Sequence, residues 1–174
     1  KFYDSGELEE EIYYENGVHT KTTFWRKSGK KWGEEYYEND NTVRSTIFWE
    51  ESGKIKEEGY YGYDKFRKKL SGTAFYKSGK KERVTDWKDG KTVRETMFYE
   101  SGIKKSVKHY KNGKPEGLIK FWFESGKKNS ETHYKNGKEE GLVTQWYETG
   151  NKLYEATNKN GNREGLSTWW YQTG

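Results

Sequence analysis

Aromatic and β-branched residues recur along the chain in short runs of six to eight residues, and glycine turns bound these runs. Ser-Gly or Thr-Gly pairs follow one another at steps of 23 to 26 residues. Runs of this length are too short for helices and are typical of β-strands. The periodic pattern therefore predicts a repeat protein built from strands. The glycines that end these pairs are Gly6, Gly29, Gly53, Gly79, Gly102, Gly126, Gly150 and Gly174.

A second turn lies eleven residues after each of the first seven of these glycines. Five of the second turns read Asn-Gly or Asp-Gly, as at Asn112-Gly113 and Asn136-Gly137. These dipeptides tolerate the positive φ of a type I′ turn, whose twist matches paired antiparallel strands. The predicted fold class is all-β, an elongated antiparallel β-meander that forms a single-layer repeat sheet of successive hairpins, with about 24 residues per repeat.

We expect residues 1–174 to form one continuous repeat domain of about seven hairpin repeats, with a repeat interrupted at each end. Roughly fifteen strands at about 4.8 Å spacing would make a sheet about 70 Å across. The end strands of such a sheet expose unpaired backbone groups, so assembly through the sheet edges is an open alternative. The repeat between Asp64 and Gly79 is longer than the others, which predicts a bulge or a longer loop.

The position four residues before each Ser-Gly or Thr-Gly glycine is aromatic in all eight copies. Adjacent strand residues point to opposite faces, so this series is expected to line one face of the sheet. Cross-strand contacts between the rings then form a structural aromatic ladder. Its residues are Phe2, Trp25, Trp49, Phe75, Phe98, Trp122, Trp146 and Trp170.

The composition indicates an ordered chain with few residues available for a hydrophobic core. Only 29% of residues are hydrophobic, but 18% are aromatic and can be buried. No stretch approaches the roughly 18 to 20 apolar residues that span a bilayer, so we expect no transmembrane segment. The sequence contains no Cys, which excludes disulfides and thiolate metal sites. A cytoplasmic location and export with a leader outside this chain both remain open.

Charge is segregated along the chain. Residues 1–64 hold 9 Lys or Arg against 15 Asp or Glu, residues 65–120 hold 17 against 6, and residues 121–174 hold 7 against 7. A basic middle segment would attract anionic surfaces, although lysines also protect exposed strands from edge pairing. The candidate basic patch consists of Lys65, Arg67, Lys68, Lys69, Lys77, Lys80, Lys81, Arg83, Lys104, Lys105 and Lys108.

The sequence offers little support for catalysis. His109 and His133 occupy the same repeat position two strands apart, which places them roughly 9.6 Å from each other and too far apart to share one metal ion. Neighbouring carboxylates such as Glu57 and Glu58 project to opposite faces of a strand. No phosphate-binding glycine loop, nucleophile elbow or metal-ligand spacing occurs. We therefore expect no enzyme activity, catalytic residue, cofactor or metal site.

Two segments carry a family resemblance. They read Tyr-Lys-Asn-Gly-Lys-Pro-Glu-Gly-Leu at 110–118 and Tyr-Lys-Asn-Gly-Lys-Glu-Glu-Gly-Leu at 134–142, and each is followed by Trp-Phe/Tyr-Glu-Ser/Thr-Gly. The chain resembles bacterial MORN repeat variants of the type found in antitoxin or immunity proteins and in some exported proteins. The Gly-Lys-x-Glu-Gly element is complete in those two copies alone. The repeats are also similar, more weakly, to tyrosine-aspartate repeats of toxin shells and to choline-binding wall modules.

The resemblance implies a binding protein of bacterial origin. We expect a non-catalytic protein that presents an extended aromatic and basic sheet face to a protein partner, with a toxin as the candidate partner. The alternative is an exported or cell-surface module that binds anionic lipid or glycan through residues 65–120. Nucleic acid is disfavoured, because the rings recur in every strand whether it is basic or not, which indicates a structural role.

Overall fold

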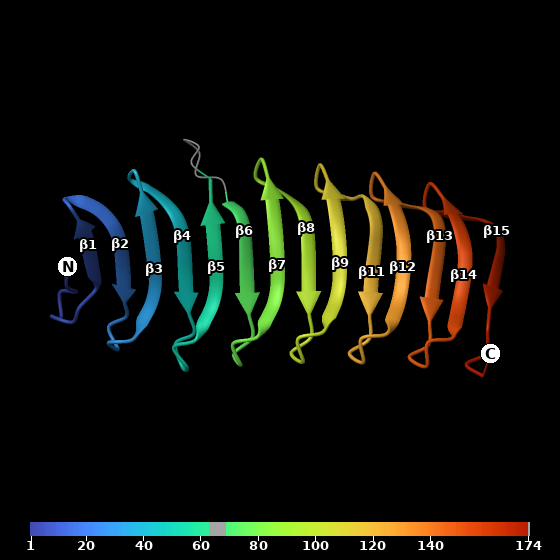
Figure 1. Cartoon of the computed structure of the whole chain (residues 1–174), viewed down its shortest axis with the longest axis horizontal. Helices are drawn as coiled ribbons and strands as arrows, with labels where there is room; N and C mark the ends of the chain where they lie inside the picture. The colour runs from blue at the N-terminus through green and yellow to red at the C-terminus, as the bar shows by residue number, and fades with distance from the viewer. Residues whose placement is uncertain (63–68, 174) are drawn as a thin grey trace. The chain divides into compact units, whose positions relative to one another are not determined.

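The computed structural model describes residues 1–62 and 69–173, and the described residues form fifteen strands and no helix (Figure 1). They divide into two compact units, residues 1–81 and residues 82–174. The loop predicted after Asp64 lies largely outside the described residues, as do the predicted patch residues Lys65, Arg67 and Lys68. The expectation of one continuous repeat domain stays a prediction.

The first unit is a meander in which each strand pairs antiparallel with the next. The second unit repeats this arrangement, and the two-residue strand β10 pairs with β9 beside β11. The strands of the first unit are β1 (Glu10–Glu15), β2 (Val18–Trp25), β3 (Lys31–Glu38), β4 (Asn41–Phe48), β5 (Ile55–Tyr61) and β6 (Lys69–Phe75). Those of the second are β7 (Lys81–Lys88), β8 (Lys91–Phe98), β9 (Lys104–Lys111), β10 (Lys114–Pro115), β11 (Gly117–Trp122), β12 (Lys128–Lys135), β13 (Lys138–Trp146), β14 (Lys152–Lys159) and β15 (Asn162–Trp169). The first residue of β7, Lys81, is also the last residue of the first unit.

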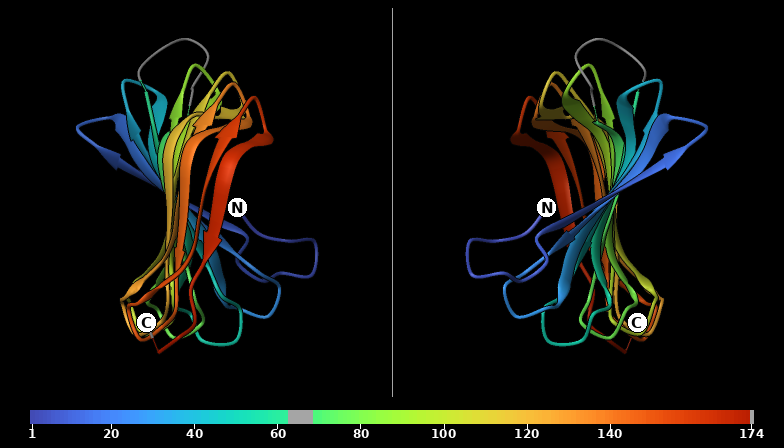
Figure 2. Two further views of the ribbon diagram at one scale, coloured as in Figure 1. Left: turned by 90° about the vertical axis from the view of Figure 1, so that its right-hand side faces the viewer. Right: turned by 90° about the vertical axis from the view of Figure 1, so that its left-hand side faces the viewer.

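The predicted all-β meander of successive hairpins is therefore confirmed in each unit. Figure 2 shows the strands of each unit as a single twisted layer, and the rotation between neighbouring strands is the usual right-handed strand twist. The Asn-Gly turns have the predicted geometry, since Asn112 and Gly113 have φ values of 52° and 77°. Positive φ at both central positions is the requirement of a type I′ turn.

The second glycine of the Gly-Lys-x-Glu-Gly element also has positive φ, at +80° for Gly117 and +87° for Gly141. In the β12–β13 pair the register passes from Thr132↔Val143 to Tyr134↔Glu139, so β13 carries two more residues than its partner there. Repeats without this glycine have a bulge of one residue, as in β4 beside β3. The complete element thus encodes a wider bulge, for which a left-handed glycine is suited.

Few side chains are buried in this layer. Among the described residues the buried hydrophobic ones are Ile119, Val143, Tyr154 and Ala156, all in the second unit. Most of the other fully covered positions carry small hydroxyl residues, such as Thr22 and Ser106. Cross-strand contacts, not a conventional core, therefore hold neighbouring repeats together.

Candidate binding surface

The predicted aromatic ladder lies at the strand ends next to the Ser-Gly and Thr-Gly turns. Five of its residues, Trp25, Phe75, Phe98, Trp122 and Trp146, are the last residues of β2, β6, β8, β11 and β13. Trp170 lies one residue beyond β15. Phe2 forms an isolated bridge with Leu8 and is 64% exposed.

One position differs from the expected ladder. Phe48 pairs with Ile55 as Trp25 pairs with Lys31, so Phe48 occupies the place expected for Trp49. The reason is that the turn between Phe48 and Ile55 is one residue longer than the turn between Trp25 and Lys31. The Trp49 N–H donates to the Lys54 carbonyl five residues on, whereas the equivalent bond at Arg26 reaches four residues on.

A tyrosine hydroxyl links consecutive repeats beside the ladder. Tyr99 Oη donates to the Trp122 carbonyl at 2.9 Å, and Tyr147 Oη donates to the Trp170 carbonyl at 2.9 Å. Tyr3 makes the same bond to Trp25 at 2.8 Å. The position three residues before each Ser-Gly or Thr-Gly glycine is aromatic in six of eight copies, and in these three repeats its tyrosine joins one hairpin to the next.

Lysines that follow the turns are also used within the fold. The Nζ of Lys128 lies 5.3 Å from the ring centroid of Trp146 and 3.0 Å from a carboxylate oxygen of Glu131. Lys152 repeats this geometry with Trp170 at 5.5 Å and Glu155 at 2.6 Å. Such cation–π and ion-pair contacts stabilise an exposed sheet modestly.

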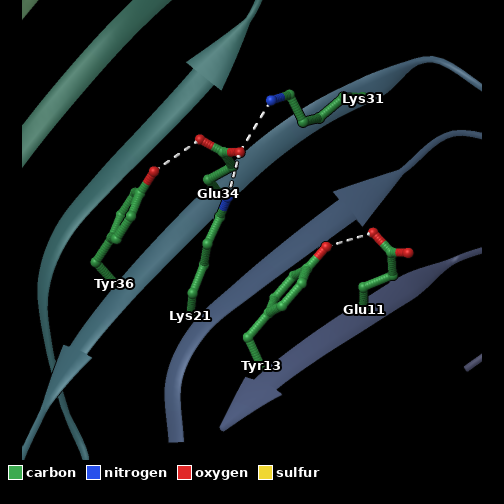
Figure 3. Close-up of polar contacts among 6 residues, drawn as sticks. All are labelled: Glu11, Tyr13, Lys21, Lys31, Glu34 and Tyr36. Atoms are coloured by element: carbon green, nitrogen blue, oxygen red, sulfur yellow. Dashed lines mark hydrogen bonds and ion pairs between the residues drawn. The ribbon is translucent and has the colours of Figure 1, made fainter. Parts of the chain in front are cut away.

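Glu34 is the centre of a polar network on one face of the first unit (Figure 3). Its carboxylate is 2.8 Å from Lys21 Nζ and 2.9 Å from Lys31 Nζ, and it accepts a 3.1 Å hydrogen bond from Tyr36 Oη. Burial favours the protonated form, but the hydrogen bonds from Lys21 and Lys31 outweigh it, so the pKa of Glu34 is lowered. The bond to Glu34 raises the pKa of Lys21 in turn.

The same face carries a row in which rings and cations alternate across β1 to β5. Cross-strand pairing sets the order Tyr13, Lys21, Tyr36, Arg44 and Tyr60. The guanidinium of Arg44 lies 3.9 Å from the Tyr36 centroid, and Lys21 Nζ lies 5.5 Å from the rings on both sides. Tyr13 and Tyr60 remain 45% and 43% exposed. We call these five residues the mixed row.

Sequence reasoning missed the mixed row, although a signal was present. Tyr13, Tyr36 and Tyr60 stand at equivalent distances from the preceding Ser-Gly turns, at seven residues for each. The intervening Lys21 and Arg44 become their neighbours through the pairing register, which the turn spacing alone did not define.

The predicted basic patch divides between the two units. In the first unit Lys69 bonds to Glu57 at 2.6 Å, and Lys77 lies 3.5 Å from Glu51 and 5.5 Å from the Trp49 centroid. Lys80 and Lys81 are exposed. Part of the expected positive charge is thus paired within the sheet.

In the second unit the remaining patch residues lie on β7 and β9. Lys108 lies 3.8 Å from Glu95, and the Nζ of Lys105 lies 5.5 Å from the Tyr99 centroid. Arg83 and Lys104 are exposed. The two histidines that share a repeat position, His109 and His133, are exposed on β9 and β12 with β11 between them.

The part of the chain that the structure describes brings together no group of three or more His, Cys, Asp or Glu side chains that could hold a metal ion. Within the same residues no helix has the length and apolar character needed to cross a membrane. Among the described buried residues Glu34 is the one carboxylate. It forms ion pairs with two lysines, Lys21 and Lys31.

Two solved structures show a low similarity to the chain. The crystal structure of accessory secretory protein 1,2 and 3 in Streptococcus pneumoniae has 13% identity and a TM-score of 0.32, over 70% of this chain and 20% of that one. The crystal structure of a GtfA/B complex bound to UDP and GlcNAc has 12% identity and a TM-score of 0.26, over 62% and 21%. The chain spans about a fifth of each. No curated protein sequence matches it.

The family comparison agrees with the repeat pattern. Residues 1–17, 91–112, 115–136 and 139–160 match the model of the MORN repeat variant. The last two segments contain the Gly117 and Gly141 bulges, whereas the segment 91–112 has Arg94 in place of this glycine. Over these four segments the chain is similar to the MORN repeat variant.

Proposed function

We propose that this chain is a non-catalytic repeat protein that binds a protein partner through an open aromatic and basic sheet face. Repeats of the matched family are generally binding modules, which supports a binding function. The mixed row is the observation that carries the proposal, since it presents Tyr and Arg side chains together on an uncovered surface. Tyr and Arg are enriched among the residues that dominate interface energies.

The chemistry of the mixed row suits a protein surface. Its rings offer large contact areas at a low cost in conformational entropy, and Arg44 is held in place by its stack on Tyr36. This stack orders the guanidinium, so a partner's acceptor would meet a preoriented donor. A preorganised surface of this kind loses less entropy on binding.

Affinity capture with the full-length protein from its native cell tests this proposal. We expect one protein to be recovered in a stoichiometric amount. The resemblance to immunity proteins leads us to extend the proposal to a toxin, and co-expression should then relieve the toxicity of the captured protein. Recovery of no stoichiometric protein would contradict the binding function.

The second candidate is binding of anionic lipid or glycan through residues 65–120. The exposed cations Lys80, Lys81, Arg83 and Lys104 favour it, because none of them forms an ion pair with a described residue. Charge reversal at Lys68, Lys69, Lys80 and Lys81 should then abolish retention on anionic liposomes or a glycan array, and retention should fall steeply with salt. Unchanged retention would exclude this patch.

A further inference from the structure

A glutamate carboxylate caps the Asn-Gly turn of the following repeat in the second unit. Glu116 accepts a 2.7 Å hydrogen bond from the backbone N–H of Asn136, and Glu140 accepts a 2.8 Å bond from that of Asn160. Each glutamate is the third residue after the glycine of the preceding turn. The turns joined in this way stand side by side along the upper edge of Figure 1.

Lysines flank the capped turn at Asn136 and the turn before it. Lys111, Lys114, Lys135 and Lys138 stand at the four strand ends of these two turns. A backbone N–H at a turn flanked by lysines favours an anion. In this repeat the chain supplies the anion itself, through Glu116.

The turn at Asn112 has lysines at the same repeat positions but no carboxylate. Lys88, Lys91 and Lys111 take the places of Lys111, Lys114 and Lys135, but Val93 stands where the later repeats have Glu116 and Glu140. A hollow of about 320 Å³ lies at this point. Its lining residues are Lys88, Asp89, Lys91, Val93, Tyr110, Lys111 and Asn112.

The charges around this hollow are unbalanced. Lys88, Lys91 and Lys111 are exposed, and Asp89 is the one carboxylate among the lining residues. The Asn112 N–H makes no hydrogen bond to a described residue, and its positive φ of 52° matches the 53° of Asn136. The turn at Asn112 therefore has the backbone conformation of the capped turn, with no carboxylate on its N–H.

We propose that the hollow beside Asn112 binds a carboxylate side chain, Asp or Glu, of an acidic segment in the protein partner. The two capped repeats are the reason for choosing a carboxylate, because they show that this group accepts a hydrogen bond from the same backbone donor at a turn that lysines flank. The inference rests on the proposed function and adds a second contact point, on the second unit, with its own chemistry.

A single exposed carboxylate contact is weak, because salt and water screen the lysines. Within a larger interface the contact would fix the register of the acidic segment more than it would add affinity. The site is nevertheless accessible to small probes, since the hollow faces solvent through its exposed lysines.

The test is a ¹H–¹⁵N NMR titration of the full chain with acetate and with an acetylated, amidated tripeptide of glutamates at low salt. We expect a saturable shift of the Asn112 amide, with a smaller response at Asn136 and Asn160. Val93→Glu would supply the missing carboxylate in cis, so binding at Asn112 should weaken at least about tenfold, which corresponds to about 1.4 kcal/mol. Glu116→Val should create a new response at Asn136.

The unchanged spectrum outside the affected turns would show that both variants remain folded. Equal binding by wild type and Val93→Glu, or no response of Asn112 to either probe, would overturn the proposal. Inorganic phosphate forms a third arm, and tighter binding of phosphate than of the tripeptide would overturn the choice of a carboxylate. Failure of these titrations would leave the partner-capture result unaffected, so the two proposals fail separately.

Discussion

The hydroxyl of Tyr147 donates a 2.9 Å hydrogen bond to the backbone carbonyl of Trp170, which lies 23 residues later in the next repeat. Tyr99 makes the equivalent bond to Trp122. At the corresponding position of the first unit Arg26 instead lies 3.7 Å from Glu50, also in the next repeat. The residue three positions before the turn glycine therefore links neighbouring hairpins by a hydrogen bond at Tyr99 and Tyr147 and by an ion pair at Arg26.

Replacement Tyr147→Phe should destabilise the second unit by about 1 kcal/mol, because it leaves the Trp170 carbonyl without this donor. The midpoint of urea unfolding, followed by tryptophan fluorescence, measures the loss. The chain offers a reciprocal control at Phe123, which lacks the hydroxyl at the same repeat position. Phe123→Tyr should add a bond to the Trp146 carbonyl and raise the midpoint, whereas lowered midpoints in both variants would contradict the assigned link.

Replacement Gly141→Ala should cost about 1 to 2 kcal/mol, because Gly141 has a φ of +87° and an L-residue is strained there. An added Cβ would meet no atom within 4 Å, so the loss would come from the backbone alone. Gly33→Ala is the matched control in the other unit. Its φ is not in the left-handed region and its Cβ would make ordinary contacts of 3.5 Å, so stability should hold or rise slightly. Equal losses in unfolding midpoint at both sites would contradict this account of the wide bulge.

The Glu34 network should make the first unit sensitive to acid. The pKa of Glu34 in the folded chain lies below its ordinary value of 4.5, so the unfolded chain binds more protons in this range. The contribution of Glu34 to stability is therefore complete above about pH 4.5 and is lost as the pH falls through the folded-state pKa. Unfolding midpoints measured across this window should fall for the wild type and fall less steeply for Glu34→Gln.

Lys21 gives the opposite dependence at high pH. Its pKa is raised above 10.5 by Glu34, so its contribution is complete below 10.5 and is lost as the pH rises through the folded-state value. The variant Lys21→Met should lack this alkaline loss. The same alkaline slope in Lys21→Met and wild type would show that other groups, such as tyrosines, cause it.

The turn spacing was sufficient to predict the strands and the hairpins, because Asn-Gly turns and alternating residues define local geometry strongly. It was insufficient at Trp49, where one added turn residue moved Phe48 into the ladder position. The carboxylate caps were also missed. Glu116 and Asn136 are 20 residues apart, and their contact depends on the lateral placement of adjacent turns.

The candidate binding residues were harder to predict than the fold. The basic patch was chosen from charge along the chain, but Lys69, Lys77 and Lys108 have acidic partners within the sheet. The mixed row instead results from cross-strand register, which brings Arg44 beside Tyr36 and Tyr60. The function of both groups remains a prediction.

The dissociation constant of the captured partner tests the central claim most directly. The double variant Tyr13→Ser, Tyr60→Ser removes the two exposed rings of the mixed row, and Tyr14→Ser removes a ring of β1 that is 62% exposed and follows Tyr13 in the strand. We predict that the double variant binds at least about tenfold more weakly, as expected for interface hot spots, while Tyr14→Ser binds as the wild type does. Unchanged affinity of a folded double variant would contradict the claim that this face holds the partner.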